Sequence, residues 1–155
     1  MNIQTKHFGE VQISEDKIIH FPYGLLGLTE YKDFTVLYDN ESEEPIISWL
    51  QSTEDKDFAL PIINPITFFS EYAPMVEDEL LKEMGELNED NFLIFNVIVI
   101  PEEVEKMTVN LKAPIIVNLD TKKARQVIVD NEDYNARYPL YEHLKKIKEK
   151  AKVGE

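Results

Sequence analysis

The feature that most constrains the fold is the run Phe-Leu-Ile-Phe-Asn-Val-Ile-Val-Ile at residues 92–100, which is apolar at eight of nine positions. Both alternating sets of side chains are apolar, which is typical of a strand in the middle of a sheet that is covered on both faces. A buried helix is the competing interpretation. The β-branched residues and the proline at position 101 favour the strand.

Other segments repeat apolar side chains at every second position, as strands with one buried face do. Residues 35–38 and 46–51 flank an acidic loop at residues 39–45, so we expect these two strands to form a hairpin. Further short strands are expected near residues 3–8, 11–13, 17–21, 58–63 and 124–129.

Residues 109–119 form a longer segment with the same two-residue period. Pro114 would lie on the face opposite its apolar side chains, and proline has no N–H to donate to a neighbouring strand. The sequence therefore predicts a long strand with an edge position or a bulge at Pro114. Its apolar face would carry Val109, Leu111, Ala113, Ile115, Val117 and Leu119.

Helices are expected to be few and short, at residues 77–87 and 101–106 and at the C-terminal end. The clearest helix covers residues 139–152, where Pro139 would open the first turn. We expect its apolar side chains to pack against the strands, although a basic amphipathic helix also suits a membrane surface or a partner protein. These side chains are Leu140, Leu144, Ile147 and Ala151.

These segments predict a mainly β chain with a small single-domain, β-barrel-like fold over residues 1–155. A few short helices and the C-terminal amphipathic helix at residues 139–152 complete it. A chain of 155 residues has the usual length of one domain and can bury a core without disulfides, which the absence of cysteine excludes.

Charge is distributed unevenly along the chain, whose formal net charge is −14. Residues 30–105 contain 20 acidic residues and three lysines, whereas residues 106–155 contain 11 basic and seven acidic residues. An acidic surface repels the phosphates that proteins bind through Lys and Arg, so we expect no direct binding of nucleic acid. The sequence shows neither a signal segment nor a run long enough to span a membrane, which predicts a cytoplasmic location.

We find no sequence motif for catalysis or metal binding. The absence of cysteine excludes thiolate chemistry, and His7, His20 and His143 are too far apart for a zinc-binding motif. The acidic clusters at residues 54–57 and 130–133 lack the glycine and distal glutamate of a calcium-binding loop. With 30 acidic residues, spacing alone does not identify a catalytic carboxylate pair. We predict no catalytic residue, no metal and no cofactor.

Two aromatic segments are candidate sites for a partner protein. Phe-Pro-Tyr-Gly-Leu-Leu-Gly at residues 21–27 predicts a turn that presents large side chains from a loop, and residues 68–72 lie among prolines. Each segment either folds back on the core or forms an apolar docking patch. The candidate contact residues are Phe21, Tyr23, Leu25, Leu26, Phe68, Phe69 and Tyr72, together with Glu43 and Glu44 of the acidic loop.

The sequence resembles the flagellar assembly factor FliW family of bacteria at five segments in order. The most specific is Asn-Leu-Lys-Ala-Pro-Ile-Ile-Val-Asn at residues 110–118, and the others lie at residues 5–11, 19–27, 49–52 and 137–140. The resemblance marks six motif residues with an expected structural role: Gly24, Gly27, Trp49, Lys112, Pro114 and Asn118.

The resemblance implies a protein-binding regulator without catalytic activity. Proteins of this family bind flagellin and, alternatively, the RNA-binding translational regulator CsrA. Binding of CsrA relieves its repression of flagellin mRNA, and newly made flagellin competes and restores repression. We therefore expect flagellin and CsrA as partners, and a monomer when unbound. Two alternatives stay open: a small acidic β-barrel enzyme, and an OB-like nucleic-acid-binding domain, which would need a basic aromatic groove.

Overall fold

Strand β7 (Phe92–Val99) occupies the centre of the structure, a computed structural model that describes residues 1–38 and 47–153. The strand predicted for this segment is confirmed. Coverage on both faces holds for its middle, where Phe95, Asn96 and Ile98 are buried, whereas Phe92 and Val99 at its ends are exposed. Phe95 packs in a cluster of buried side chains on one face and Ile98 in a cluster on the other, while three strands pair with β7 in the plane of the sheet.

Nine strands of the described residues form one antiparallel sheet. Seven of them follow the order β10-β9-β7-β6-β5-β4-β3, and the short strands at residues 108–109 and 138–139 branch off this path beside β7. The hairpin predicted around residues 39–45 is confirmed, because β4 and β5 pair in register. The remaining pair, β1 and β2, forms a separate small sheet. The bounds are β1 (Asn2–Gln4), β2 (Glu10–Gln12), β3 (Ile19–His20), β4 (Asp33–Leu37), β5 (Ile47–Ser52), β6 (Ala59–Ile63), β9 (Ile115–Asn118) and β10 (Ala124–Gln126).

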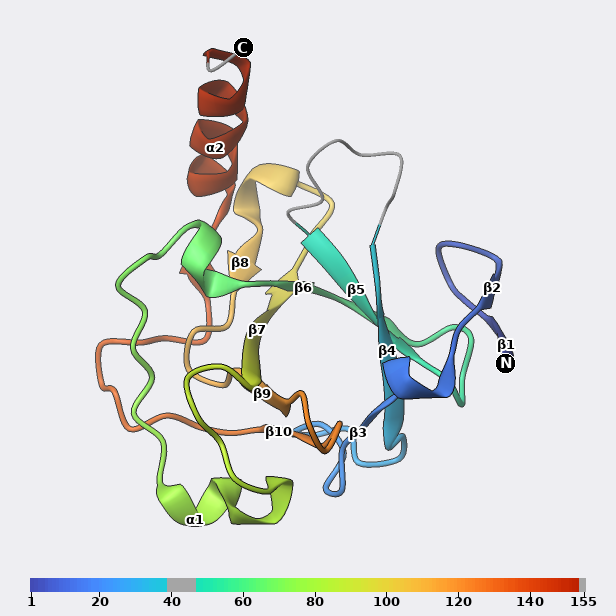
Figure 1. Ribbon diagram of the computed structural model, residues 1–155. Coiled ribbons are helices and arrows are strands. Elements are labelled where there is room, and N and C mark those ends of the chain that lie inside the picture. The colour runs from blue at the N-terminus through green and yellow to red at the C-terminus, as the bar shows by residue number, and fades with distance from the viewer. Residues whose placement is uncertain (39–46, 154–155) are drawn as a thin grey trace.

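The large sheet curls until its two end strands meet. His20 in β3 and Lys123 before β10 form an isolated bridge, and the N–H of His20 donates to the carbonyl oxygen of Lys122 at 2.8 Å. Figure 1 shows the strands arranged around a common centre as a result. The expectation of a mainly β, barrel-like fold is confirmed.

The prediction of a single long strand from residue 109 to residue 119 is wrong. Its two ends are the separate strands β8 (Thr108–Val109) and β9, and both pair with β7. Between them, residues 110–114 loop out, because the Asn110 side chain accepts hydrogen bonds from the backbone N–H groups of Lys112 and Ala113. The interruption expected at Pro114, as an edge position or a bulge, is present as this five-residue loop, which we call the bulge at residues 110–114.

The buried side chains form three clusters, and β7 contributes to each of them. Phe95 belongs to the cluster enclosed by the large sheet, Ile98 to the cluster beneath the C-terminal helix, and Ile94 packs against Met84 and Ile116 in the third. The members of the enclosed cluster are Ile19, Phe21, Leu25, Phe34, Leu50, Ile62, Phe95, Ile115, Val117 and Ala124.

The predicted helix at residues 77–87 is present as α1 (Asp78–Leu81) and the 3₁₀ turn η3 (Lys82–Met84). It ends at Gly85, whose φ of +90° favours glycine. The second predicted helix, at residues 101–106, is present only as the 3₁₀ turn η4 (Val104–Lys106). Two other 3₁₀ turns are η1 (Glu15–Lys17) and η2 (Pro65–Thr67).

The C-terminal helix α2 runs over Tyr141–Val153 rather than residues 139–152. Pro139 does not open it, because Tyr138 and Pro139 form the short strand β11 (Tyr138–Pro139) in register with β8. Leu140, just before α2, and Leu144 within it are buried in the second cluster, and Ile147 packs against them. The expected docking of this helix on the strands is confirmed.

We expect Leu144→Ala to lower the free energy of unfolding by about 2–5 kcal/mol, because the change removes a buried leucine side chain and leaves a cavity. Lys145→Ala on the exposed face of α2 is the matched control and should change it by less than about 0.5 kcal/mol. Urea unfolding measures both values. A loss below about 0.5 kcal/mol for Leu144→Ala would mean that α2 is not docked in solution.

Candidate protein-binding surfaces

The loop at residues 21–28 divides its large side chains between the core and the solvent. Phe21 and Leu25 are fully buried in the enclosed cluster, so the prediction that they contact a partner directly is wrong. Tyr23, Leu26 and Leu28 are exposed by 43, 49 and 44%. The loop therefore both folds back on the core and presents an apolar patch, and we call these three exposed residues the loop patch.

Two glycines set this division. The backbone of Leu25 exchanges hydrogen bonds with that of Leu28, which places Leu26 and Gly27 at the tip of a tight turn. Gly27 has a φ of +79°, as the third residue of a type II turn requires. Gly24 has a φ of +67° and lies against the backbone of Thr29, so an added Cβ would come within 2.7 Å of the Thr29 Cα atom.

Contacts with β10 and η3 hold the loop patch in place. The N–H of Leu26 donates to the Gln126 side chain at 3.0 Å, and the Arg125 guanidinium lies 4.2 Å from the centre of the Tyr23 ring. The Tyr23 hydroxyl donates to the Glu83 carboxylate, and this hydrogen bond raises the pKa of Tyr23. A surface held by such contacts loses little conformational freedom when a partner binds.

The second candidate segment is mainly part of the core. Phe68, Phe69 and Tyr72 are half-buried and pack with the rings of Tyr134 and Tyr138 against the second cluster. The Tyr72 hydroxyl donates to the carbonyl oxygen of Leu111 at 2.7 Å and accepts from Asn96 at 3.2 Å. Burial raises the pKa of Tyr72 to about 12, so this hydroxyl keeps its proton at neutral pH. These contacts favour a packing role for the three residues.

The motif residues mainly hold backbone segments together. Buried Asn118 donates to the carbonyl oxygens of Met84 and Glu86 and so attaches η3 to β9. The Lys112 ammonium group donates to the carbonyl oxygen of Asn131 at 2.9 Å, and Trp49 packs against His7 with ring centres 4.0 Å apart and the ring planes tilted by 37°. Pro114 is buried in the bulge.

Glu43 and Glu44, the candidate acidic contacts, lie outside the described residues. Within residues 1–38 and 47–153, no group of three or more His, Asp or Glu side chains lies close enough to hold a metal ion. No helix of this described part is both long and apolar enough to cross a membrane.

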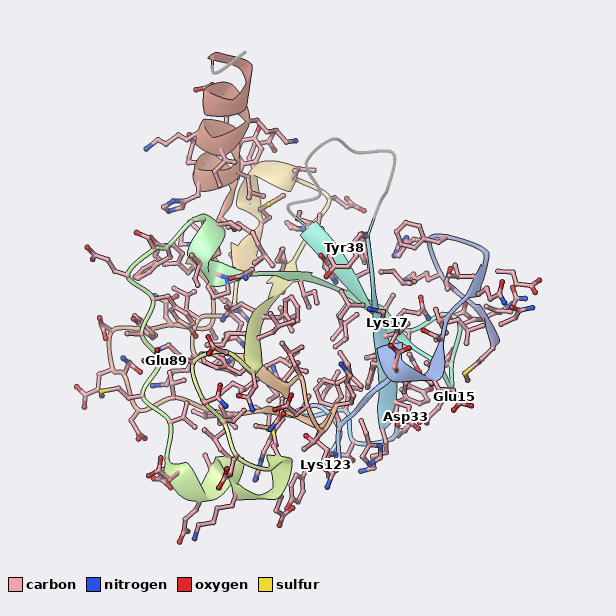
Figure 2. All side chains as sticks on the ribbon, in the orientation of Figure 1. Glu15, Lys17, Asp33, Tyr38, Glu89 and Lys123 are labelled. Atoms are coloured by element: carbon pink, nitrogen blue, oxygen red, sulfur yellow. The ribbon has the colours of Figure 1, made fainter. Side chains whose placement is uncertain are left out.

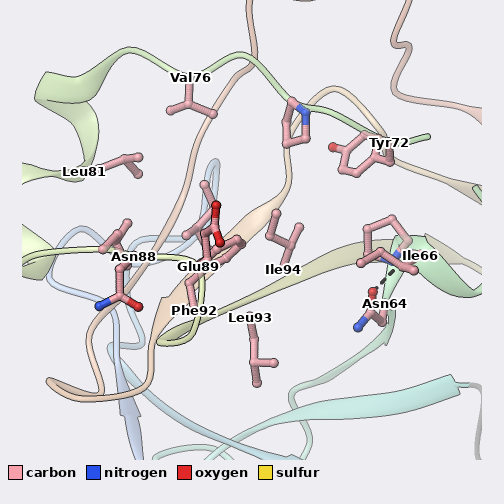
Figure 3. Close-up of a pocket in the computed structure, with 14 residues that line it drawn as sticks. Asn64, Ile66, Tyr72, Val76, Leu81, Asn88, Glu89, Phe92, Leu93 and Ile94 are labelled. Atoms are coloured by element: carbon pink, nitrogen blue, oxygen red, sulfur yellow. Dashed lines mark hydrogen bonds between the residues drawn. The ribbon is translucent and has the colours of Figure 1, made fainter. Parts of the chain in front are cut away.

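The sequence did not predict an apolar groove of about 760 Å³ beside the start of β7 (Figure 3). The walls of the groove come from residues 64–76 and 81–94 together with Ile116. Because these residues are separated in the sequence, no single sequence pattern identifies the groove. Glu89 is the acidic residue of the lining. A single carboxylate among mainly apolar side chains offers little for acid–base catalysis. The lining is Asn64, Pro65, Ile66, Tyr72, Pro74, Val76, Leu81, Leu87, Asn88, Glu89, Phe92, Leu93, Ile94 and Ile116.

Comparisons with known proteins agree over nearly the whole chain. Residues 2–140 match the family model described as FliW protein. A flagellar assembly factor FliW of Lachnospira eligens is 49% identical over 148 residues, which cover 94% of this chain and 98% of that protein. Another, of Lachnoclostridium phytofermentans, is 46% identical over 143 residues, 92% of each chain. A crystal structure of the flagellar assembly factor FliW superposes with a TM-score of 0.81 at 27% identity, covering 91% of this chain and 97% of that one.

We expect Gly24→Ala to destabilise the fold more than Gly27→Ala. Both changes place alanine at a positive φ, which costs about 1–2 kcal/mol. At Gly24 the new Cβ also meets backbone atoms of Thr29, so the total loss should reach about 2–5 kcal/mol, whereas the Cβ at Gly27 meets open space. Thermal or urea unfolding measures the difference. An equal loss for the two variants would contradict the close approach of Gly24 to Thr29.

Proposed function

Because this chain belongs to the FliW family of flagellar assembly factors, we propose that it regulates flagellum assembly by binding flagellin and, alternatively, the translational regulator CsrA. Binding of CsrA would relieve its repression of flagellin mRNA translation. Newly made flagellin would then compete for this protein and restore repression.

The observation that carries the proposal is the family match over residues 2–140, which includes the loop patch. We propose the loop patch as a contact surface for these partners, because exposed apolar patches mark interaction sites and Tyr is enriched among the residues that carry most of the energy of an interface. Tyr23, Leu26 and Leu28 are large, exposed and held by β10 and η3.

Charge supports CsrA as one of the partners. A regulator that binds RNA needs a basic surface, and residues 30–105 of this chain contain 20 acidic residues against three lysines. Opposite charges accelerate the encounter of two proteins, and an acidic protein docked beside an RNA site repels phosphates. Glu43 and Glu44 stay proposed contributors to this attraction.

We further propose that the chain acts in the cytoplasm, as a monomer when unbound, and has neither catalytic activity nor direct contact with RNA. An enzyme would need polar side chains that converge in a pocket. The groove beside β7 is mainly apolar. An OB-like domain would need a basic aromatic groove, which the acidic composition of residues 30–105 opposes.

A titration with labelled flagellin mRNA leader tests the proposal. We expect no shift of the RNA with this protein alone, release of RNA when the protein is added to a CsrA–RNA complex, and recovery of the complex when flagellin is added. A salt-sensitive complex between the RNA and this protein alone would contradict the proposal and favour the nucleic-acid-binding alternative.

Variants of exposed residues test the loop patch in the same titration. We expect Leu26→Asp to raise the concentration needed for RNA release by about tenfold, since it places a charge in an apolar contact. Val104→Asp in η4 is the matched control, because Val104 is 44% exposed and Leu26 is 49% exposed. Equal release by the wild-type and Leu26→Asp proteins would exclude the loop patch as the contact surface.

A further inference from the structure

Among the described residues, strand β7 has an edge without a partner over its first four residues. On one side, residues 92–95 pair with β9. On the other side, β6 pairs with β7 at Ile62–Val97 and Ile63–Asn96, after which the chain turns away through Asn64 into η2. No strand of residues 1–38 or 47–153 pairs with residues 92–95 on that second side.

The alternation of the ladder shows which backbone groups face this edge. The carbonyl oxygens of Asn91 and Val97 accept hydrogen bonds from the Leu119 and Asn110 N–H groups, on the side of β9 and β8. In an antiparallel pair, the backbone groups of successive residues point to opposite sides. The N–H and C=O groups of Phe92 and Ile94 therefore face the unpaired edge.

The apolar groove lies along the same edge. Its lining includes both Leu93, which packs against the enclosed cluster, and Ile94, which packs against the third cluster on the other face. Figure 3 shows these two side chains on opposite sides of the strand, with Asn64 and Ile66 at one end of the groove. A hollow that reaches both faces of one strand lies at the edge of that strand, where an added strand would lie.

The surroundings of the groove are apolar and acidic. Ile66 is 66% exposed and Phe92 is 39% exposed, so apolar surface is available to a ligand. Residues 64–94 contain eight acidic residues and one lysine. Glu89 belongs to the lining and lies far from Asp33 and Glu15 in the view of Figure 2.

We propose that this edge binds an extended segment of a partner protein, which adds to β7 as a further strand. Backbone hydrogen bonds to Phe92 and Ile94 would give affinity, and side chains at alternate positions would enter the groove. The acidic surroundings select a segment with apolar residues at alternate positions and Lys or Arg at its ends. A helical segment would satisfy none of the free backbone groups of β7. This site lies outside the loop patch and goes beyond the proposed function, because it does not depend on which protein supplies the segment.

Selection of random displayed dodecapeptides on the full chain tests this inference, with affinities measured on synthetic copies of the selected peptides. We expect alternating apolar residues flanked by Lys or Arg. Ile66→Asp should weaken binding at least about tenfold, whereas Val104→Asp, also an exposed apolar residue in a 3₁₀ turn, should change it less than about twofold.

Amide hydrogen exchange gives a readout that needs no variant. Bound peptide should slow exchange at the N–H groups of Phe92 and Ile94 at least about tenfold, and leave Leu93, which faces β9, nearly unchanged. N-methylation of the peptide should abolish binding only at alternate positions. Helical spacing in the selected peptides, unchanged exchange at Phe92 and Ile94, equal binding to the Ile66→Asp protein, or no selected peptide would each overturn the inference. None of these results depends on Leu26, so the proposed contact with CsrA is tested separately.

Discussion

The rest of the structure depends on how β7 buries side chains on both faces while its backbone pairs with three other strands. Asn96 in its middle is fully buried and donates to the carbonyl oxygen of Asn110 at 2.8 Å and to the Tyr72 hydroxyl. Tyr72 in turn donates to Leu111. This polar chain joins β7, the bulge at residues 110–114 and the aromatic segment, and it allows β8 and β9 to share one neighbour.

The position of the bulge decides where the candidate surfaces lie. Once residues 110–114 have looped out, β9 aligns with the first half of β7, and β10 follows on its far side. Asn118 at the end of β9 attaches η3, which carries Glu83, while β10 carries Arg125 and Gln126. These three side chains hold the loop patch, so a constraint in the centre of the sheet reaches the surface through two strands and a 3₁₀ turn.

The sequence predicts elements whose pattern is local and misses those that depend on tertiary contacts. Residues 92–99 are recognisable because both alternating sets are apolar. The period-two pattern after residue 108 does not reveal the loop at residues 110–114, because the Asn110 side chain forms it by bonding to the backbone. Likewise, the sequence places large side chains in the loop at residues 21–28, but the φ angles of Gly24 and Gly27 decide which of them face solvent. The groove arises only where β6 leaves β7.

We propose that this protein acts through alternative contacts with two proteins rather than through catalysis. Titration calorimetry of the purified full chain with CsrA, before and after saturation with flagellin, tests it most directly. We expect saturable heat with each partner alone and no heat from CsrA once flagellin is bound. Undiminished binding of CsrA to the flagellin complex, or the absence of binding to both proteins, would contradict the claim.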